Sequence, residues 1–145
     1  VAGMDAVVRY LEGLGRLINP AVTPRRAALV AAANAIRDYE TQLSRAMLDV
    51  LDNAKATVYG ITAKDQISHR TPTLCFNLPG IHPATVTEEL AKQNIGVRDG
   101  HMYSPRLMKR LGLSQESGAV RASLVHYNTL DEIHRFESAL SEINR

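Results

Sequence analysis

The chain has 145 residues, a formal net charge of +2 and 45% hydrophobic residues, which is typical of one globular domain and excludes a disordered segment. Basic and acidic residues are interspersed, aromatic residues make up 5% and tryptophan is absent, so a nucleic-acid partner is not expected. The single cysteine, Cys75, predicts a reducing, cytoplasmic setting, and no apolar run reaches the roughly 18 residues of a membrane span.

Two helices are predicted for the first third of the chain. Apolar residues recur at helical spacing from about residue 4 to residue 14, and Asn19-Pro20 then breaks the pattern. A second apolar stripe continues from about Pro24 to Asn53 without an internal glycine or proline, which predicts a helix on the order of 45 Å long. A globule of this size does not need such a helix for its own core, so we expect it to brace a second domain.

The rest of the chain alternates short strands with helices. Strands are expected at residues 56–59, 73–78, 95–98 and 119–127, and helices at residues 82–94, 104–112 and 129–143. Thr129 and Glu132 have the spacing of a capping box at the start of the last helix. This order predicts an α+β fold, in which a small, mainly antiparallel sheet has helices packed on one face and is preceded by a long helix.

Two arginines are candidates for binding an anion. Arg121 lies beside small residues on a strand that is otherwise apolar, and its planar guanidinium suits a carboxylate or a phosphate. A structural ion pair is the common alternative for such an arginine. Arg98 ends a neighbouring strand next to Asp99, with which it would pair in solvent. Because both strands lead to the same end of the sheet, the two arginines together define a candidate anion site.

The loop between these strands carries further candidates. His101 suits an acid, base or stacking role, or a capping role, and Tyr103 would either position a substrate or pack over the following short helix. Cys75 is expected to be a small buried residue and His126 a core or interface histidine. The histidines lack metal-binding spacing, and GxSxG and glycine-rich phosphate loops are absent, so neither a metal site nor a complete set of catalytic residues is expected.

The segments "IGVRDGHMYSPRLMKRLGL" (95–113) and "AVRASLVHYNTLDEIHRFESAL" (119–140) resemble the C-terminal part of class V aminotransferases, in particular their cysteine desulfurase-like branch. The resemblance covers nearly the whole chain from about residue 7. It implies a fold type I, pyridoxal 5'-phosphate (PLP)-dependent enzyme that acts on an amino acid. Arg121 would then bind the substrate carboxylate, Arg98 would face the same site, and the loop with His101, Met102 and Tyr103 would reach toward the cofactor.

Two departures from the family pattern limit what the resemblance implies. Tyr103 stands where the closest desulfurases carry a cysteine, and a phenol cannot accept sulfur. The Schiff-base lysine of the family also has no counterpart in this chain. The resemblance therefore implies a C-terminal fragment, inactive by itself and without catalytic residues of its own, from a cytoplasmic, homodimeric enzyme.

The expected domain organisation follows from this interpretation. Residues 1–22 would be a helix and linker leading from a missing large PLP-binding domain, and residues 23–145 would be the small domain. The alternative is a free-standing, non-catalytic α+β module that binds a small anion or a protein partner. A cut enzyme would expose the apolar side chains of its first helix, such as Met4 and Val7, whereas a free-standing module would not.

Overall fold

A computed structural model describes residues 2–144, which form two compact units, one up to Glu40 and the other from Thr41. The division falls inside α2 (Arg25–Asn53), so the first part of this helix belongs to one unit and its last part to the other. The long helix predicted from the sequence is thus confirmed. The assignment of residues 1–22 and 23–145 to separate domains remains a prediction.

The first unit is a helical pair in which α1 (Ala2–Ile18) packs on the first part of α2. The helix α1 is longer than the predicted 4–14, because Gly15 lies inside it and is buried against α2. A Cβ atom on Gly15 would lie only 1.8 Å from the carbonyl oxygen of Ala28. The glycine therefore permits the close approach of the two helices instead of ending the first.

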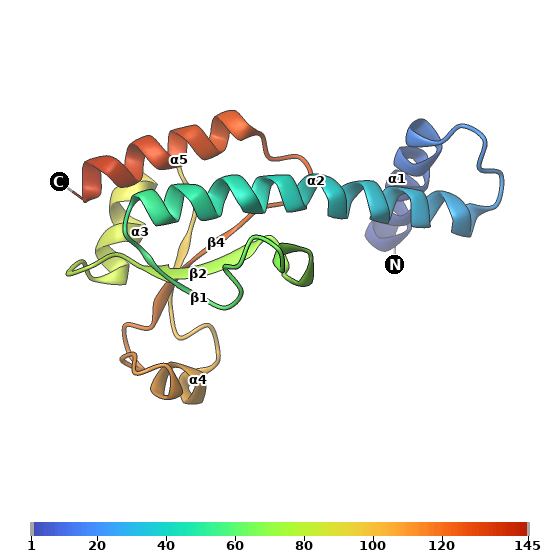
Figure 1. The fold of residues 1–145 in the computed structure, drawn as a ribbon. Coiled ribbons are helices and arrows are strands. Elements are labelled where there is room, and N and C mark those ends of the chain that lie inside the picture. The colour runs from blue at the N-terminus through green and yellow to red at the C-terminus, as the bar shows by residue number, and fades with distance from the viewer. Residues whose placement is uncertain (1, 145) are drawn as a thin grey trace. The chain divides into compact units, whose positions relative to one another are not determined.

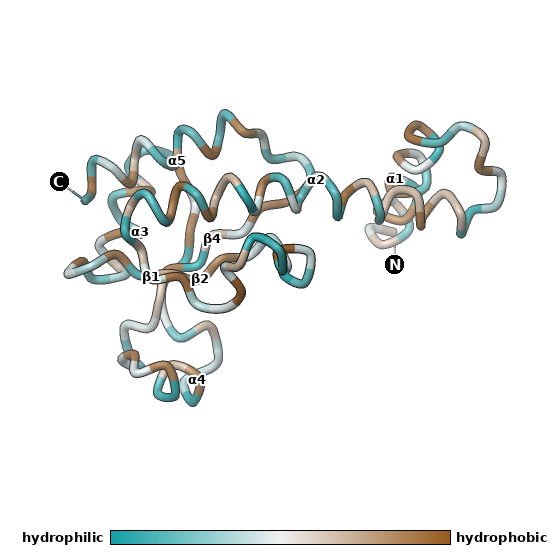
Figure 2. Tube along the Cα trace, in the orientation of Figure 1, coloured by the Kyte–Doolittle hydropathy of each residue, from teal (hydrophilic) through white to brown (hydrophobic). Residues whose placement is uncertain are grey.

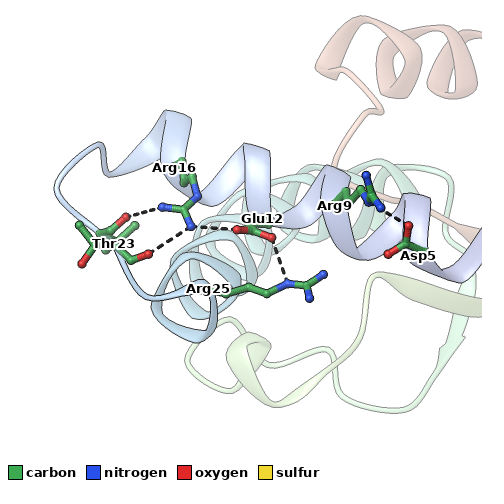
Figure 3. Close-up of polar contacts among 7 residues, drawn as sticks. Asp5, Arg9, Glu12, Arg16, Thr23 and Arg25 are labelled. Atoms are coloured by element: carbon green, nitrogen blue, oxygen red, sulfur yellow. Dashed lines mark hydrogen bonds and ion pairs between the residues drawn. The ribbon is translucent and has the colours of Figure 1, made fainter.

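Polar contacts hold the connection between these two helices (Figure 3). The Glu12 carboxylate pairs with Arg16 at 2.8 Å and with Arg25 of α2 at 3.0 Å. The Arg16 guanidinium also donates to the backbone carbonyls of Val22 and Thr23, at 2.9 and 3.1 Å. The hydrogen bond from Arg16 is the main reason why the pKa of Glu12 lies below its ordinary value.

The second unit contains a four-stranded sheet in the order β1-β2-β4-β3, with every neighbouring pair antiparallel. Its strands are β1 (Thr57–Tyr59), β2 (Thr73–Asn77), β3 (Arg98–Gly100) and β4 (Ala119–Ser123). A short 3-10 turn, η1 (Ile67–His69), lies between β1 and β2. The helices are α3 (Pro83–Lys92), the short α4 (Pro105–Arg110) and α5 (Leu130–Ile143), together with the end of α2. Figure 1 shows α4 on the opposite side of the sheet from α5.

One face of the sheet, here called the core face, packs against helices. The side chains on this face are only 0–4% exposed; they are Leu74, Phe76, Val120 and Ala122. The ring of Phe76 meets that of Phe136 on α5 edge-on, with 6.2 Å between ring centroids. Hydrophobic positions recur along α5 between hydrophilic ones (Figure 2), as expected for a helix with one face on the core. The predicted α+β fold with helices packed on one face of a small antiparallel sheet is confirmed, with the short α4 on the other side as the exception.

Two predicted strands differ from the observed ones. The strand predicted at 119–127 ends at Ser123, because the Asn128 side chain accepts a 2.8 Å hydrogen bond from the Val125 N–H and closes a turn. His126 therefore lies half-buried in a turn and not on a strand face. The strand predicted at 95–98 begins only at Arg98 and continues to Gly100. Residues 95–97 instead line a cavity next to α5.

The start of α5 follows the prediction closely. The Thr129 side chain accepts from the Glu132 N–H at 3.2 Å, and the Glu132 carboxylate accepts from the Thr129 N–H at 2.8 Å. This reciprocal pair is the predicted capping box. None of the helices described for residues 2–144 has the length and apolar character required to cross a lipid bilayer.

Candidate functional site

The face of the sheet opposite the core face, here called the polar face, carries one row of side chains across all four strands. Strand pairing places Tyr59 opposite Cys75, Cys75 opposite Arg121, and Arg121 opposite Arg98. Successive residues of a strand point to opposite faces, and Phe76 and Val120 point to the core, so this row points away from α5. The predicted alternation in β2 between apolar and polar residues is confirmed.

The two arginines of this row have no acidic partner. Arg121 is half-buried and Arg98 is exposed, and within residues 2–144 neither forms an ion pair. The ion pair between Arg98 and Asp99 is absent there, and these neighbours on one strand point to opposite faces. Like charges directly opposite each other on neighbouring strands are destabilising. An anion bound between these guanidinium groups would remove that repulsion.

Cys75 lies beside Arg121 in the row and is half-buried, where the sequence predicted a buried residue. Burial raises the pKa of its thiol, and the nearby positive charges of Arg121 and Arg70 offset only part of that increase. The thiol therefore stays protonated at neutral pH, which makes it a poor nucleophile.

Arg70 is a third cation near Cys75, and no pattern in the sequence points to it. Its guanidinium donates to the backbone carbonyls of Ile61, Thr71 and Thr73, the last at 3.0 Å. Partial burial lowers the pKa of Arg70, but a guanidinium keeps its charge at any physiological pH. Arg70 thus closes the loop between β1 and β2, and its donors are used inside the protein.

The loop after β3 has an unusual backbone. Met102 and Tyr103 both have positive φ values, 50° and 60°, and the Ser104 N–H donates to the His101 carbonyl at 2.8 Å. These are features of a type I′ turn, whose central positions are usually glycine, asparagine or aspartate. A residue other than glycine in this left-handed backbone region destabilises the fold by about 1–2 kcal/mol. Strain of this kind at a loop is a reason to look for function there.

His101 stabilises this turn with its own side chain. Its Nδ1 accepts a 3.1 Å hydrogen bond from the Tyr103 N–H, so in the neutral imidazole the proton is on Nε2. The capping role weighed for His101 is thus observed. The Tyr103 side chain is 98% exposed, which excludes the alternative that it packs over the short helix. Met102, between them, is half-buried.

The four lysines, the residue type that binds PLP covalently, lie outside the strands that carry Arg98 and Arg121. They are Lys55, Lys64, Lys92 and Lys109, and none of them belongs to the four strands. Lys64 pairs with Asp49 at 2.9 Å, and Lys92 pairs with Glu89 at 2.6 Å. The part of the chain that the structure describes also holds no cluster of three histidine, cysteine or acidic side chains suited to a metal ion.

The structure brings some of the predicted residues together. Arg121 and Arg98 are direct neighbours on the polar face. The turn of His101, Met102 and Tyr103 begins directly after Gly100, the last residue of β3. Asn77, which joins β2 to the end of that loop through Gly118, was not among the predicted site residues. An asparagine in the interior of a predicted strand was an available signal, because asparagine is rare in strands.

Comparison with known proteins places this site in context. The family model described as Aminotransferase class-V matches residues 27–136. The aminotransferase-like protein FGM3 of Gibberella zeae is 38% identical over 113 residues, which are 76% of this chain and 28% of that protein. A probable cysteine desulfurase of Pseudomonas putida is 34% identical over 143 residues, which are 98% of this chain and 29% of that protein.

A solved structure agrees with these sequence relatives. The apo cysteine desulfurase of Thermococcus onnurineus NA1 matches with a TM-score of 0.69 and 30% identity, covering 85% of this chain and 32% of its own. The chain therefore spans about three tenths of the length of the relatives that it matches.

Proposed function

Because this chain belongs to the class V aminotransferase family, we propose that it is the part of a PLP-dependent amino-acid enzyme that binds the substrate carboxylate. The family is PLP-dependent, and PLP supplies the electron sink for reactions at the amino-acid α-carbon. Arg121 binds the carboxylate through two parallel hydrogen bonds, and Arg98 adds a second positive charge beside it. The observation that carries the proposal is the arginine pair without an acidic partner within residues 2–144.

The turn after β3 supplies the wall of the proposed site. His101, Met102 and Tyr103 shape the pocket near the bound amino acid, with the Tyr103 side chain free to reach a ligand because it is almost fully exposed. Two carboxylate hydrogen bonds from Arg121 orient the amino acid, and an oriented substrate needs less ordering in the transition state.

The proposed reaction does not pass sulfur through this loop. Tyr103 offers a phenol where the resemblance expects a cysteine, and Cys75 has a thiol whose pKa is raised by burial. We therefore propose an amino-acid reaction of the family other than a desulfuration that uses a loop persulfide. This chain by itself is expected to be inactive, since a Schiff-base lysine is not among its residues.

Exposed apolar side chains support the view that further protein covers this chain. On α1 the exposed fractions are 77% for Met4, 57% for Val7 and 78% for Leu17. Exposed groups of this kind mark surfaces that contact other protein. We propose that this face meets the rest of a longer, homodimeric and cytoplasmic enzyme, as the resemblance implies.

The carboxylate site can be tested on this chain alone. Nuclear magnetic resonance of the arginine Nε–Hε groups during titration with L-alanine should shift the Arg121 and Arg98 signals, with a Kd on the order of 10 mM for one charged, bidentate contact. L-alaninamide, which lacks the carboxylate, should leave both signals in place. The Arg121→Met variant should lose the response of Arg98. Equal shifts with the acid and the amide would overturn the proposed site.

A further inference from the structure

Asn77 connects two parts of the polar face that are far apart in sequence. Its side-chain amide donates to the Tyr59 hydroxyl at 3.3 Å and to the backbone carbonyl of Gly118 at 3.2 Å. Only the NH2 group can meet a carbonyl favourably, so the Gly118 contact determines which way the amide points. In this orientation the Oδ1 atom of Asn77 is buried, and within residues 2–144 it has no hydrogen-bond partner.

The orientation of Asn77 therefore has a cost. A buried acceptor without a partner destabilises a protein, because it loses its hydrogen bonds to water and gains none inside the fold. The asparagine is thus a weak choice for stability alone. Its placement is better explained by what the bond to Gly118 holds in position.

Gly118 lies at the neck of the segment that forms α4, here called the α4 lobe and defined as residues 101–117. The lobe leaves the sheet after Gly100 and returns at Gly118, and these two glycines contact each other through a backbone bridge. A Cβ atom on Gly118 would lie 2.0 Å from the Gly100 oxygen and 2.7 Å from the His101 nitrogen. Both glycines also have positive φ, so no other residue fits this crossing without strain.

The neck connects directly to the strained turn. His101 follows Gly100, and the turn that it opens holds Met102 and Tyr103 in the left-handed region. Strained backbone persists only where its surroundings hold it in place. On the other side of the neck, Gly118 precedes β4 by one residue, and Arg121 follows on that strand.

We infer that Asn77 is a positioning residue that holds the neck of the α4 lobe and thereby sets the place of the His101–Tyr103 turn relative to Arg121. The inference rests on the proposed function, since it assigns this spacing to the carboxylate site. Asn77 itself does not contact the ligand. It lies on β2, next to the strand that carries Arg121, and reaches the lobe only through Gly118.

The test compares Asn77→Leu with a matched control on the same strand and face. Thr73→Val removes the hydrogen bond between the Thr73 and Ser123 hydroxyls, at 3.2 Å, which joins the same two strands at the end away from the lobe. Amide hydrogen exchange is measured for the Tyr103 and Ser104 N–H groups and for the β2 amides. Titration with L-alanine is followed at the Arg121 side chain.

In Asn77→Leu, exchange at Tyr103 and Ser104 should become about tenfold faster while β2 amides keep their rates, and the affinity for L-alanine should fall about threefold or more. Thr73→Val should change neither. If Asn77→Leu does not fold, Asn77→Ala removes the same donor without added bulk. Unchanged exchange in the turn would overturn the inference, and so would faster exchange throughout the sheet with unchanged affinity, which is the result of a purely structural role.

The two proposals fail in different ways. If wild-type Arg121 does not respond to L-alanine, the carboxylate site is wrong, and with it the assigned purpose of Asn77. If wild-type protein binds L-alanine and Asn77→Leu matches it in affinity and in exchange at the turn, only the role of Asn77 is wrong.

Discussion

The two faces of the four-stranded sheet are built from the same strands but differ in what they contribute. The core face buries Leu74, Phe76, Val120 and Ala122 almost completely. The polar face places Arg121 opposite Arg98 without an acidic partner within residues 2–144. Burial of apolar groups stabilises the fold, whereas like charges directly opposite each other on neighbouring strands destabilise it. The core face therefore supplies stability, and the proposed carboxylate site lies on the polar face, so mutations on the two faces should have different effects.

The largest effect is expected on the core face. Phe76→Ala should lower the free energy of unfolding by about 3–5 kcal/mol, because it removes a buried ring that contacts Phe136 and leaves a cavity. Urea denaturation followed by circular dichroism measures this change. A loss below about 1 kcal/mol would mean that the core face is not the main source of stability.

The next effect concerns the loop that borders the polar face. Arg70→Met keeps much of the side-chain bulk but removes the donors to three backbone carbonyls, so the free energy of unfolding should fall by about 1.5–3 kcal/mol. Arg106→Met, at an exposed position of α4, is the control and should be neutral. Equal denaturation midpoints for the two variants would contradict the role given to Arg70.

A small effect of opposite sign is expected for the arginine pair. Arg121→Met should leave the free energy of unfolding unchanged or raise it by up to about 1 kcal/mol, because it removes repulsion with Arg98. The difference should shrink as salt is added, since salt screens the interaction. Destabilisation by more than about 1 kcal/mol would show that Arg121 serves the fold, and would remove the contrast between the two faces.

The smallest effect is a shift in the chemistry of Cys75. Its thiol has a pKa raised by burial and partly offset by Arg121 and Arg70, so alkylation by iodoacetamide should rise only at a pH above the ordinary thiol range. Arg121→Met removes one of the offsetting charges and should move the midpoint of the pH–rate curve further upward. Arg98→Met, which lies beyond Arg121 in the row, is the control with a smaller shift. A midpoint that moves downward would contradict this arrangement of charges.

Local signals in the sequence were enough to predict most elements of the fold. The capping box of Thr129 and Glu132 and the alternation within β2 are set by neighbours a few residues apart, so they are visible without a structure. The errors occurred at the ends of elements, in α1 and in two of the strands. Asn128 ended β4 early through a side-chain hydrogen bond, which hydrophobic periodicity does not report.

By itself, the sequence determined the order of helices and strands, the apolar stripe of each helix and the presence of two arginines on neighbouring segments. Only the tertiary structure decided that Arg98 lies opposite Arg121, that Cys75 lies on the same row, and that Asn77 reaches Gly118 across 41 positions. The physical reason is that periodicity depends on covalent spacing along the chain. Cross-strand register depends instead on which distant segments pair, and that is settled when the whole core is buried.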